Sequence, residues 1–363
     1  MAREELRGKC GAGAPARVCR RNEMSPTPLS TTQQPRWPRR IAIGLACAAI
    51  FLAFAGASYQ FISTARDRRA YPVPGKFVDL EGYKMHIDCI GQGSPPVILD
   101  SGLGDSYLSY HKVQPQIAQF ARVCSYDRAG VGYSDSSSQP RTSRVMAEEL
   151  HALLRAAGIA PPYILVGHSL GGYTVRLYAS LYPSEVVGMV LIDASHPDQE
   201  NRFPPELKNM EGTWLREAEF LAYTMPFGIP RLLALCDDEP AQRAAECNWH
   251  TAREAVAELK AFPESAAQAA ATSSLGDIPL AVLSHDPDKP SAELPPDLAK
   301  PVNDAWEKMQ EELSHLSTRG TQTIAKNSAH YIQIDRPDVV IEAIRNVVDQ
   351  ARAQQPASPF KSN

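Results

Sequence analysis

A serine at a strand–turn–helix junction is the strongest chemical signal in this sequence. Residues 163–166 are apolar and lead into Gly167-His168-Ser169-Leu170-Gly171, after which apolar residues recur at helical spacing as far as Leu181. A Gly-x-Ser-x-Gly turn in this setting holds the serine at a strained backbone position, with its hydroxyl exposed beyond the end of the strand. Glycine is needed on both sides because the strand and helix backbones approach closely. Ser169 is therefore the predicted nucleophile.

A serine hydroxyl at neutral pH needs a general base, which in turn needs an orienting carboxylate. In the chain order serine, acid, histidine, the base follows the turn. His330 is the predicted base because the small residues Ser328 and Ala329 let its loop approach the nucleophile. His285, at the end of a predicted strand, is the alternative, whereas His315 is expected on a helix surface.

The carboxylate that orients the base is predicted from its place in the chain. Asp286 is the first choice because it follows the penultimate predicted strand and precedes Pro287, which restricts the loop. Asp288, two residues further on, and Asp193, at the end of the preceding strand, remain open as alternatives. Any of the three could instead be a turn residue or a helix cap.

Hydrolysis through a serine nucleophile also needs two N–H donors for the oxyanion. The N–H of Leu170, directly after the nucleophile, is the first predicted donor. The second is the N–H of Leu103, in the glycine-containing segment 101–104 that follows another short apolar strand. His168, next to the nucleophile, is expected to serve packing because adjacent side chains at such a turn diverge.

Alternating strand and helix patterns surround these residues from about residue 76 to residue 352. This alternation predicts an α/β fold with a mostly parallel sheet covered on both faces, whose ligand site lies at the carboxyl ends of the strands. Residues 107–120 are expected to form one helix. Residues 196–276 interrupt the alternation with prolines and alanine-rich stretches, which predicts an inserted helical cap between two core segments, 76–195 and 277–352.

The N-terminal part of the chain has a different character. Residues 1–40 are rich in Arg, Pro, Ser and Thr, and predict a disordered basic segment. Residues 41–59 are uncharged and apolar over about the 20 residues that span a bilayer. This run predicts a transmembrane anchor or, with Ala-Gly-Ala at 55–57 as a cleavage site, a signal peptide. More Lys and Arg precede the run than follow it, so residues 60–75, a predicted linker, and all that follows are expected outside the cytoplasm.

Composition and residue pattern give no indication of a nucleic-acid partner or of a bound metal. The 363 residues carry a formal net charge of −4, which gives no indication of a nucleic-acid partner. The sequence contains no cluster of metal ligands, and no metal or cofactor is expected. Residues 353–363 form a polar, proline-containing tail.

Taken together, four motifs resemble the α/β-hydrolase superfamily, and in particular its cap-bearing, haloperoxidase- and esterase-like branch. The resemblance runs from about Phe77 to Val347. The motifs are Ser101-Gly102-Leu103-Gly104, residues 125–134 with Asp127-Arg128, Gly167-His168-Ser169-Leu170-Gly171-Gly172 and Ser328-Ala329-His330-Tyr331. The resemblance implies a Ser-His-acid triad with Ser169 and His330 at the matching positions, and a structural role for Asp127-Arg128. The usual His-Gly of the oxyanion segment is Ser101-Gly102 here.

The resemblance also implies neighbouring strands that place Cys89 beside Cys124, a plausible disulfide in an oxidising compartment. Cys236 and Cys247 both lie in the cap and are hypothesised to form a second disulfide. The expected activity is hydrolysis of a small-molecule carboxylic ester or, less readily, an amide. The alternatives are an acyltransferase or perhydrolase with the same triad, and a membrane-tethered ligand-binding protein. Epoxide hydrolases and haloalkane dehalogenases need a carboxylate where Ser169 stands.

Overall fold

A computed structural model describes residues 37–289 and 294–354. The chain divides into two units, residues 1–49 and residues 50–363. The long helix α1 (Trp37–Ala70) begins in the first unit and ends in the second. All contacts reported below lie within the second unit.

Within the described residues, eight strands form one sheet in the order β1-β2-β4-β3-β5-β6-β7-β8. The strands are β1 (Lys76–Asp79), β2 (Lys84–Ile90), β3 (Val97–Asp100), β4 (Val123–Tyr126), β5 (Tyr163–His168), β6 (Val186–Ile192), β7 (Leu280–His285) and β8 (Gly320–Ala325). β1 and β2 pair antiparallel, as do β2 and β4, and the other pairs are parallel. The predicted mostly parallel α/β sheet is confirmed.

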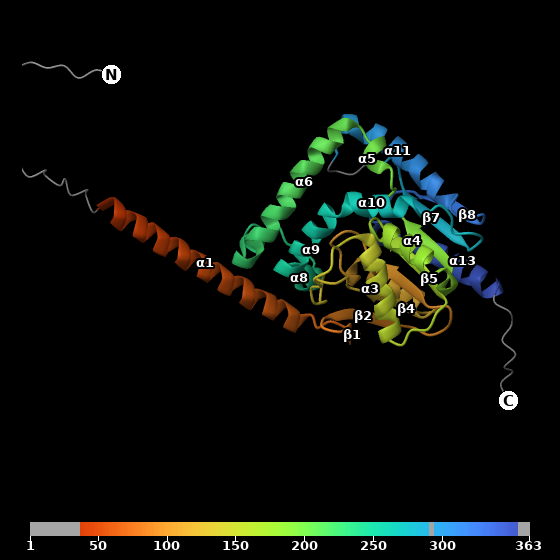
Figure 1. Cartoon of the computed structure of the whole chain (residues 1–363), viewed down its shortest axis with the longest axis horizontal. Helices are drawn as coiled ribbons and strands as arrows, with labels where there is room; N and C mark the ends of the chain where they lie inside the picture. The colour runs from red at the N-terminus through yellow and green to blue at the C-terminus, as the bar shows by residue number, and fades with distance from the viewer. Residues whose placement is uncertain (1–36, 290–293, 355–363) are drawn as a thin grey trace, which may run out of the picture. The chain divides into compact units, whose positions relative to one another are not determined.

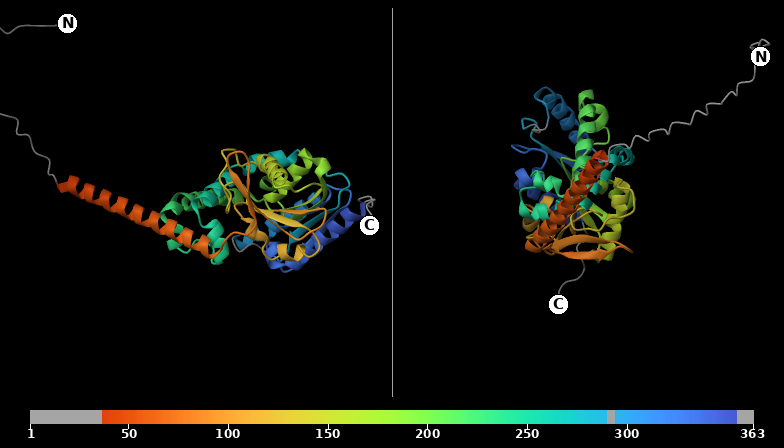
Figure 2. Two further views of the ribbon diagram at one scale, coloured as in Figure 1. Left: turned by 90° about the horizontal axis from the view of Figure 1, so that it is seen from below. Right: turned by 90° about the vertical axis from the view of Figure 1, so that its left-hand side faces the viewer.

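Helices cover both faces of the sheet, as the continuous apolar runs of β3, β5 and β6 require. On one face, α3 (Ser143–Ala156) and α4 (Gly171–Leu181) bury Leu150 and Val175 against the strands. On the other, α13 (Pro337–Gln354) buries Ile344 and Val348. Figure 2 shows the sheet between the yellow-green helices and the blue α13.

The segment between β6 and β7 is helical. Its elements are α5 (Gln199–Arg202), α6 (Pro205–Thr224), η3 (Met225–Phe227), α7 (Ile229–Leu232), α8 (Pro240–Glu246), α9 (Trp249–Lys260) and α10 (Phe262–Ala270). We call this segment the cap. In the cap α9 packs on α6, and α10 packs on α3 and α4 of the core (Figure 1). The remaining elements are η1 (Tyr107–Tyr110), α2 (Gln114–Ile117), η2 (Pro183–Glu185), α11 (Pro296–Ser314) and α12 (Ile332–Asp335).

Two predictions about local structure are wrong. Residues 107–120 form η1 and α2 rather than one helix, because Pro115 has no N–H with which to continue a helix that began before it. Residues 60–75 are not simply a linker, since α1 continues to Ala70. No proline follows Gly56 until Pro72, and helices tend to end before the residue that precedes a proline.

Among the described residues there are two disulfides, Cys89–Cys124 and Cys236–Cys247, as hypothesised. The first joins directly paired residues of β2 and β4. The second lies within the cap, between α7 and the end of α8. Disulfides typically form and persist in oxidising compartments.

Candidate active site

Ser169 occupies a left-handed backbone position, with φ of 51°, between β5 and α4. A Cβ built on Gly167 would lie 2.6 Å from the Gly171 carbonyl oxygen, and one built on Gly171 would lie 2.6 Å from that of Asp100. Real side chains do not fit at such distances, so both glycines are required by the close approach. His168 and Leu170 are buried, whereas Ser169 is partly exposed at the carboxyl edge of the sheet.

His330 lies in the loop between β8 and α12, and its side chain is 39 % exposed. Its Nδ1 is 2.6 Å from Oδ2 of Asp193, the residue that follows β6. The N–H of Ser169 donates to the carbonyl of Ile192, and Ser195 N–H donates to that of Ser169. The nucleophile turn and the loop that carries Asp193 are therefore joined directly, with His330 bound to the same loop through its Nδ1.

Asp193 is completely buried and accepts hydrogen bonds from several directions. Besides His330, Trp306 Nε1 lies 2.8 Å from its Oδ1, and His285 approaches with both its backbone N–H and its Nδ1, the latter 2.9 Å from Oδ2. Burial alone would raise the pKa of Asp193, but the hydrogen bonds and charges of His285 and His330 hold it well below its usual range. The carboxylate is therefore ionised throughout the ordinary pH range.

His285 is a second imidazole on the same carboxylate. The amide of Asn303 donates to the Pro287 carbonyl, which turns its Oδ1 toward His285 Nε2 at 3.3 Å. Both ring nitrogens of His285 therefore face oxygen acceptors, an arrangement that favours the doubly protonated ring. Burial opposes the charge, but the hydrogen bond and charge of Asp193 raise the pKa of His285 overall.

The prediction that Asp286 orients the base is corrected by this geometry. Asp286 accepts hydrogen bonds from the Asn327 N–H at 2.8 Å and from Lys326 Nζ at 2.9 Å, which lower its pKa to about 2. Asp288 is exposed and lies 3.5 Å from Lys326. The Asp286 N–H also donates to the Ser328 carbonyl. The backbone and side chain of Asp286 therefore join the loops after β7 and β8, and the carboxylate does not bind His330.

His168, expected to serve packing, also holds the predicted base. Its Nε2 lies 3.1 Å from the His330 carbonyl oxygen, and the two rings are 4.7 Å apart. Burial, together with the charge of His330, lowers the pKa of His168 to about 3, so the ring is neutral and its Nε2–H is the donor. This contact brings the His330 loop over the residue next to the nucleophile.

The predicted oxyanion donors lie on adjacent segments. Asp100 and Ser101 carbonyls contact Gly171 at the start of α4, and a Cβ on Gly102 would be 2.9 Å from His168 Nδ1. Within the described part of the chain, neither the Leu103 nor the Leu170 N–H has a protein acceptor. An oxyanion hole requires N–H groups that are free to bind a substrate oxygen, and these two meet that requirement.

The cap holds the loop that contains Leu103. Glu258 of α9 accepts from the Gly104 N–H at 2.8 Å and from the Nε of Arg128 at 2.8 Å. Arg128 also donates to Asp100 and to the Ser101 carbonyl. Every one of these charged groups is buried. The structural role expected for Asp127-Arg128 thus extends to joining the core, the loop and the cap.

Replacing Glu258 by alanine is expected to lower the free energy of unfolding by about 3–5 kcal/mol, because it leaves the buried Arg128 with one carboxylate partner fewer. Urea denaturation followed by circular dichroism measures the change. The same substitution at the exposed Glu264 of α10 is the control. Equal stability of the two variants would contradict a structural role for Glu258.

Glu246 of α8 forms another cap–core contact, accepting from the N–H and hydroxyl of Ser106 at 3.1 and 2.7 Å. Burial and the charge of Asp105 raise its pKa to about 8. The folded protein therefore retains a proton that the unfolded chain loses above about pH 4.5, so this glutamate lowers stability progressively between about pH 4.5 and pH 8.

Replacing Glu246 by glutamine should accordingly raise the Tm at pH 8 more than at pH 5. Glutamine keeps an oxygen acceptor for Ser106 and removes the charge. Differential scanning fluorimetry across this range, with Glu311→Gln on the exposed face of α11 as the control, measures the difference. A Tm gain that does not depend on pH would argue against a protonated Glu246.

A cavity of about 330 Å³ adjoins the predicted base. Its walls include the following six residues: Asp193, Phe203, Trp214, His285, Trp306 and His330. Trp214 of α6 is a large apolar side chain of the cap that lines this cavity. Met225 is buried elsewhere in the cap, and Phe220, Phe227 and Leu232 are exposed.

No group of three or more metal-ligating side chains is found in residues 37–289 and 294–354. The sequence did not single out Trp306, Asn303 or the second-imidazole role of His285. The sequence did indicate Asp193 as a candidate acid, because it comes at the end of an apolar strand next to the nucleophile strand. It indicated Asp286 in the same way. The two carboxylates differ in the direction of their side chains, and strand order alone does not determine that direction.

Comparison with known proteins agrees with this fold. A family model described as alpha/beta hydrolase fold matches residues 95–236. An uncharacterised protein of Bacillus subtilis, YqjL, is 27% identical over 279 residues, which cover 74% of this chain and 89% of that protein. Among solved structures, a thermophilic esterase from Thermogutta terrifontis aligns with a TM-score of 0.56 and 20% identity, covering 77% of this chain and 99% of the esterase. A putative acyltransferase from Salmonella enterica aligns with a TM-score of 0.58 and 19% identity, over 76% and 95% of the two chains.

Proposed function

Because the chain has the α/β-hydrolase fold, we propose that it is a serine hydrolase that cleaves a carboxylic ester through Ser169, His330 and Asp193. One observation carries the proposal. A serine with a φ of 51° stands at the carboxyl edge of the sheet, and the loop beside it carries a buried carboxylate bound to an exposed histidine. A carboxylate at Ser169 would be needed for the epoxide-hydrolase or dehalogenase chemistry of related folds.

In the proposed reaction, Ser169 Oγ attacks the acyl carbon while His330 Nε2 takes its proton. Asp193 accepts the hydrogen bond from His330 Nδ1 and stabilises the imidazolium that forms. The N–H groups of Leu103 and Leu170 stabilise the oxyanion of the tetrahedral intermediate. His330 then protonates the leaving alcohol, and water, activated by the same histidine, releases the acid from the acyl-enzyme.

A fluorophosphonate probe tests this proposal directly, since it phosphonylates an activated serine without needing the natural substrate. We expect a stoichiometric adduct on the peptide that contains Ser169, found by mass spectrometry, and turnover of short p-nitrophenyl esters. A protein that is neither labelled nor active would favour a ligand-binding role. Preferred transfer of the acyl group to an added alcohol or peroxide would favour the acyltransferase or perhydrolase alternative.

The proposed site of action is a membrane surface outside the cytoplasm. Helix α1 contains an 18-residue window with a mean hydropathy of 2.2, none of it buried, which is long and apolar enough to span a bilayer. The two disulfides support an oxidising compartment. We favour an anchor over a cleaved signal peptide because α1 is continuous through residues 55–57. The intact mass of the membrane-extracted protein distinguishes the two.

A further inference from the structure

The end of the cap that lies beside α1 exposes a run of large apolar side chains. We call residues 220–235 the cap tip; they include the C-terminal end of α6, η3 and α7. The exposed fraction of these side chains lies between 42 % for Phe227 and 73 % for Tyr223. The full set is Phe220, Tyr223, Phe227, Leu232, Leu233 and Leu235. Six such residues within 16 positions are more than the scattered apolar exposure of an ordinary soluble surface.

The cap tip packs against α1 at a glycine. A Cβ on Gly56 would collide with the Phe227 carbonyl oxygen, so the helix and the cap tip are in backbone contact. From the other side, a Cβ on Gly228 would lie 2.9 Å from the Tyr59 ring and 3.5 Å from Gln60 Cβ. Gly228 itself has a φ of 70°, which favours glycine at this position.

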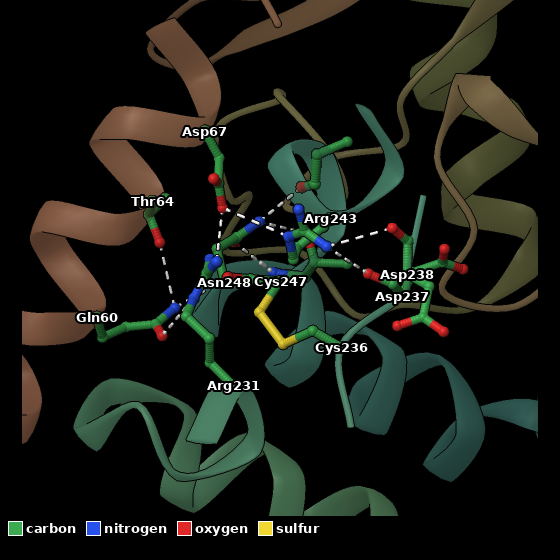
Figure 3. The surroundings of a disulfide bond; sticks show 12 residues. Gln60, Thr64, Asp67, Arg231, Cys236, Asp237, Asp238, Arg243, Cys247 and Asn248 are labelled. Atoms are coloured by element: carbon green, nitrogen blue, oxygen red, sulfur yellow. Dashed lines mark hydrogen bonds and ion pairs between the residues drawn. A yellow bond between two sulfur atoms is a disulfide. The ribbon is translucent and has the colours of Figure 1, made fainter. Parts of the chain in front are cut away.

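Polar contacts on the next turns of α1 fix this arrangement (Figure 3). Gln60 Nε2 donates to the Cys247 carbonyl at 2.9 Å, and Arg231 forms an ion pair with Asp67. The disulfide from Cys236 to Cys247 connects the segment that follows Arg231 to the residue that Gln60 contacts. The cap tip is thus held at one level of α1 and cannot slide along it without breaking these contacts.

The position on α1 at which the cap tip is held lies within the apolar part of the helix. Twenty residues counted from Ile41, about the thickness of the hydrocarbon core, end at Gln60. Gly56 is four residues, or about 6 Å, before that end. The helix side chains around it, Phe54, Phe61 and Ile62, are 63–76 % exposed. The first charged residue after the apolar run, Arg66, is about 15 Å further along the helix.

We propose that the cap tip inserts into the outer leaflet of the lipid bilayer that α1 spans. The inference rests on the membrane anchor of the proposed function. If residues 41–60 occupy the hydrocarbon core, a segment in backbone contact with Gly56 lies at the boundary between acyl chains and headgroups. Transfer of the exposed apolar side chains of the cap tip from water into this region lowers the free energy. The cap tip contacts α1 within its apolar run, and both segments expose large apolar side chains, which is why a bilayer is favoured as the partner of the cap tip over a second copy of the chain.

The experiment measures depth in the bilayer with the full chain in phosphatidylcholine–phosphatidylglycerol nanodiscs. Cys10, Cys19 and Cys47 are changed to serine, and the fluorophore NBD is attached to a single new cysteine. Leu232→Cys places the label on the cap tip, Phe54→Cys places it on the apolar length of α1, and Glu311→Cys places it on α11 as a water-exposed control. Lipids with a doxyl group on the acyl chain near the headgroup serve as quenchers.

We expect the doxyl lipids to reduce the fluorescence at positions 232 and 54 by about threefold and to leave that at 311 unchanged. Quenching at 54 but not at 232 overturns the proposal and leaves the anchor standing. No quenching at either position overturns both. A blue-shifted but unquenched label at 232 would indicate burial against protein, and also overturns it. The measurement needs no turnover, so its outcome is independent of the proposed esterase activity.

Discussion

Replacing Ser169 by alanine is expected to reduce kcat/KM for a short p-nitrophenyl ester by about 10⁴-fold or more, because the members of a catalytic triad act as a unit. Alanine fits the site sterically and preserves the backbone hydrogen bonds that Ser169 makes with Ile192 and Ser195. The loss should appear in kcat, and fluorophosphonate labelling should disappear with it. Steady-state kinetics and intact-protein mass spectrometry measure the two effects.

The matched control for this variant is Ser195→Ala. Ser195 lies on the neighbouring loop and is also buried, but no step of the proposed reaction uses its hydroxyl. We expect it to retain activity within about threefold, in the range of substitutions away from the reacting groups. If Ser169→Ala hydrolysed the ester at the parent rate, the mechanism would have to be abandoned.

Replacing Asp193 by asparagine is expected to lower kcat by about 10³–10⁴-fold, since the amide cannot orient His330 in the correct tautomer or stabilise its charge. An asparagine NH₂ would also face N–H donors from His285, His330 and Trp306, which leaves some of them without an acceptor. The measurement is kcat from pH 5 to pH 9, together with the Tm, so that lost activity is separated from lost fold.

Asp286→Asn distinguishes the two candidate acids. Its partners are Lys326, whose side chain is more than half exposed, and the backbone N–H groups of Asn327 and Asp288, from which an asparagine oxygen can still accept. We expect activity within about threefold of the parent, because Asp286 contacts none of the groups used in the proposed reaction and its ion pair is with a largely exposed lysine. A larger loss in Asp286→Asn than in Asp193→Asn would restore the acid to the loop after β7.

The sequence predicted the fold well because its signals are local. Continuous apolar runs at residues 163–166 and 187–192 require burial on both faces, and the turn around Ser169 requires glycines at fixed places. The boundary errors have local causes too. Pro115 interrupts the helix predicted for residues 107–120, and the lack of a proline between residues 60 and 70 lets α1 continue through the predicted linker.

The choice between Asp193 and Asp286 as the acid that orients His330 could not be made from local sequence patterns. Asp193 and Asp286 both follow apolar strands and both lie at the carboxyl edge of the sheet. What separates them is a φ of 42° at Asp193, which directs its carboxylate over the end of β7, and the Lys326 and Asn327 contacts that hold Asp286 away. Both differences depend on the conformation of loops and on contacts with residues more than 30 positions away in the sequence. A local sequence pattern carries no information about either.

The hydrogen bond between Glu258 and the Gly104 N–H has a consequence for protein engineering. Exchanging helical insertions between members of a superfamily is a natural way to alter substrate preference. Here the insertion also supplies the anion that positions the loop beside the nucleophile and neutralises Arg128. On the proposed mechanism, a chimaera that discards this glutamate is expected to lose turnover, whatever pocket it acquires. Grafts should therefore retain α9 and exchange the helices that precede it.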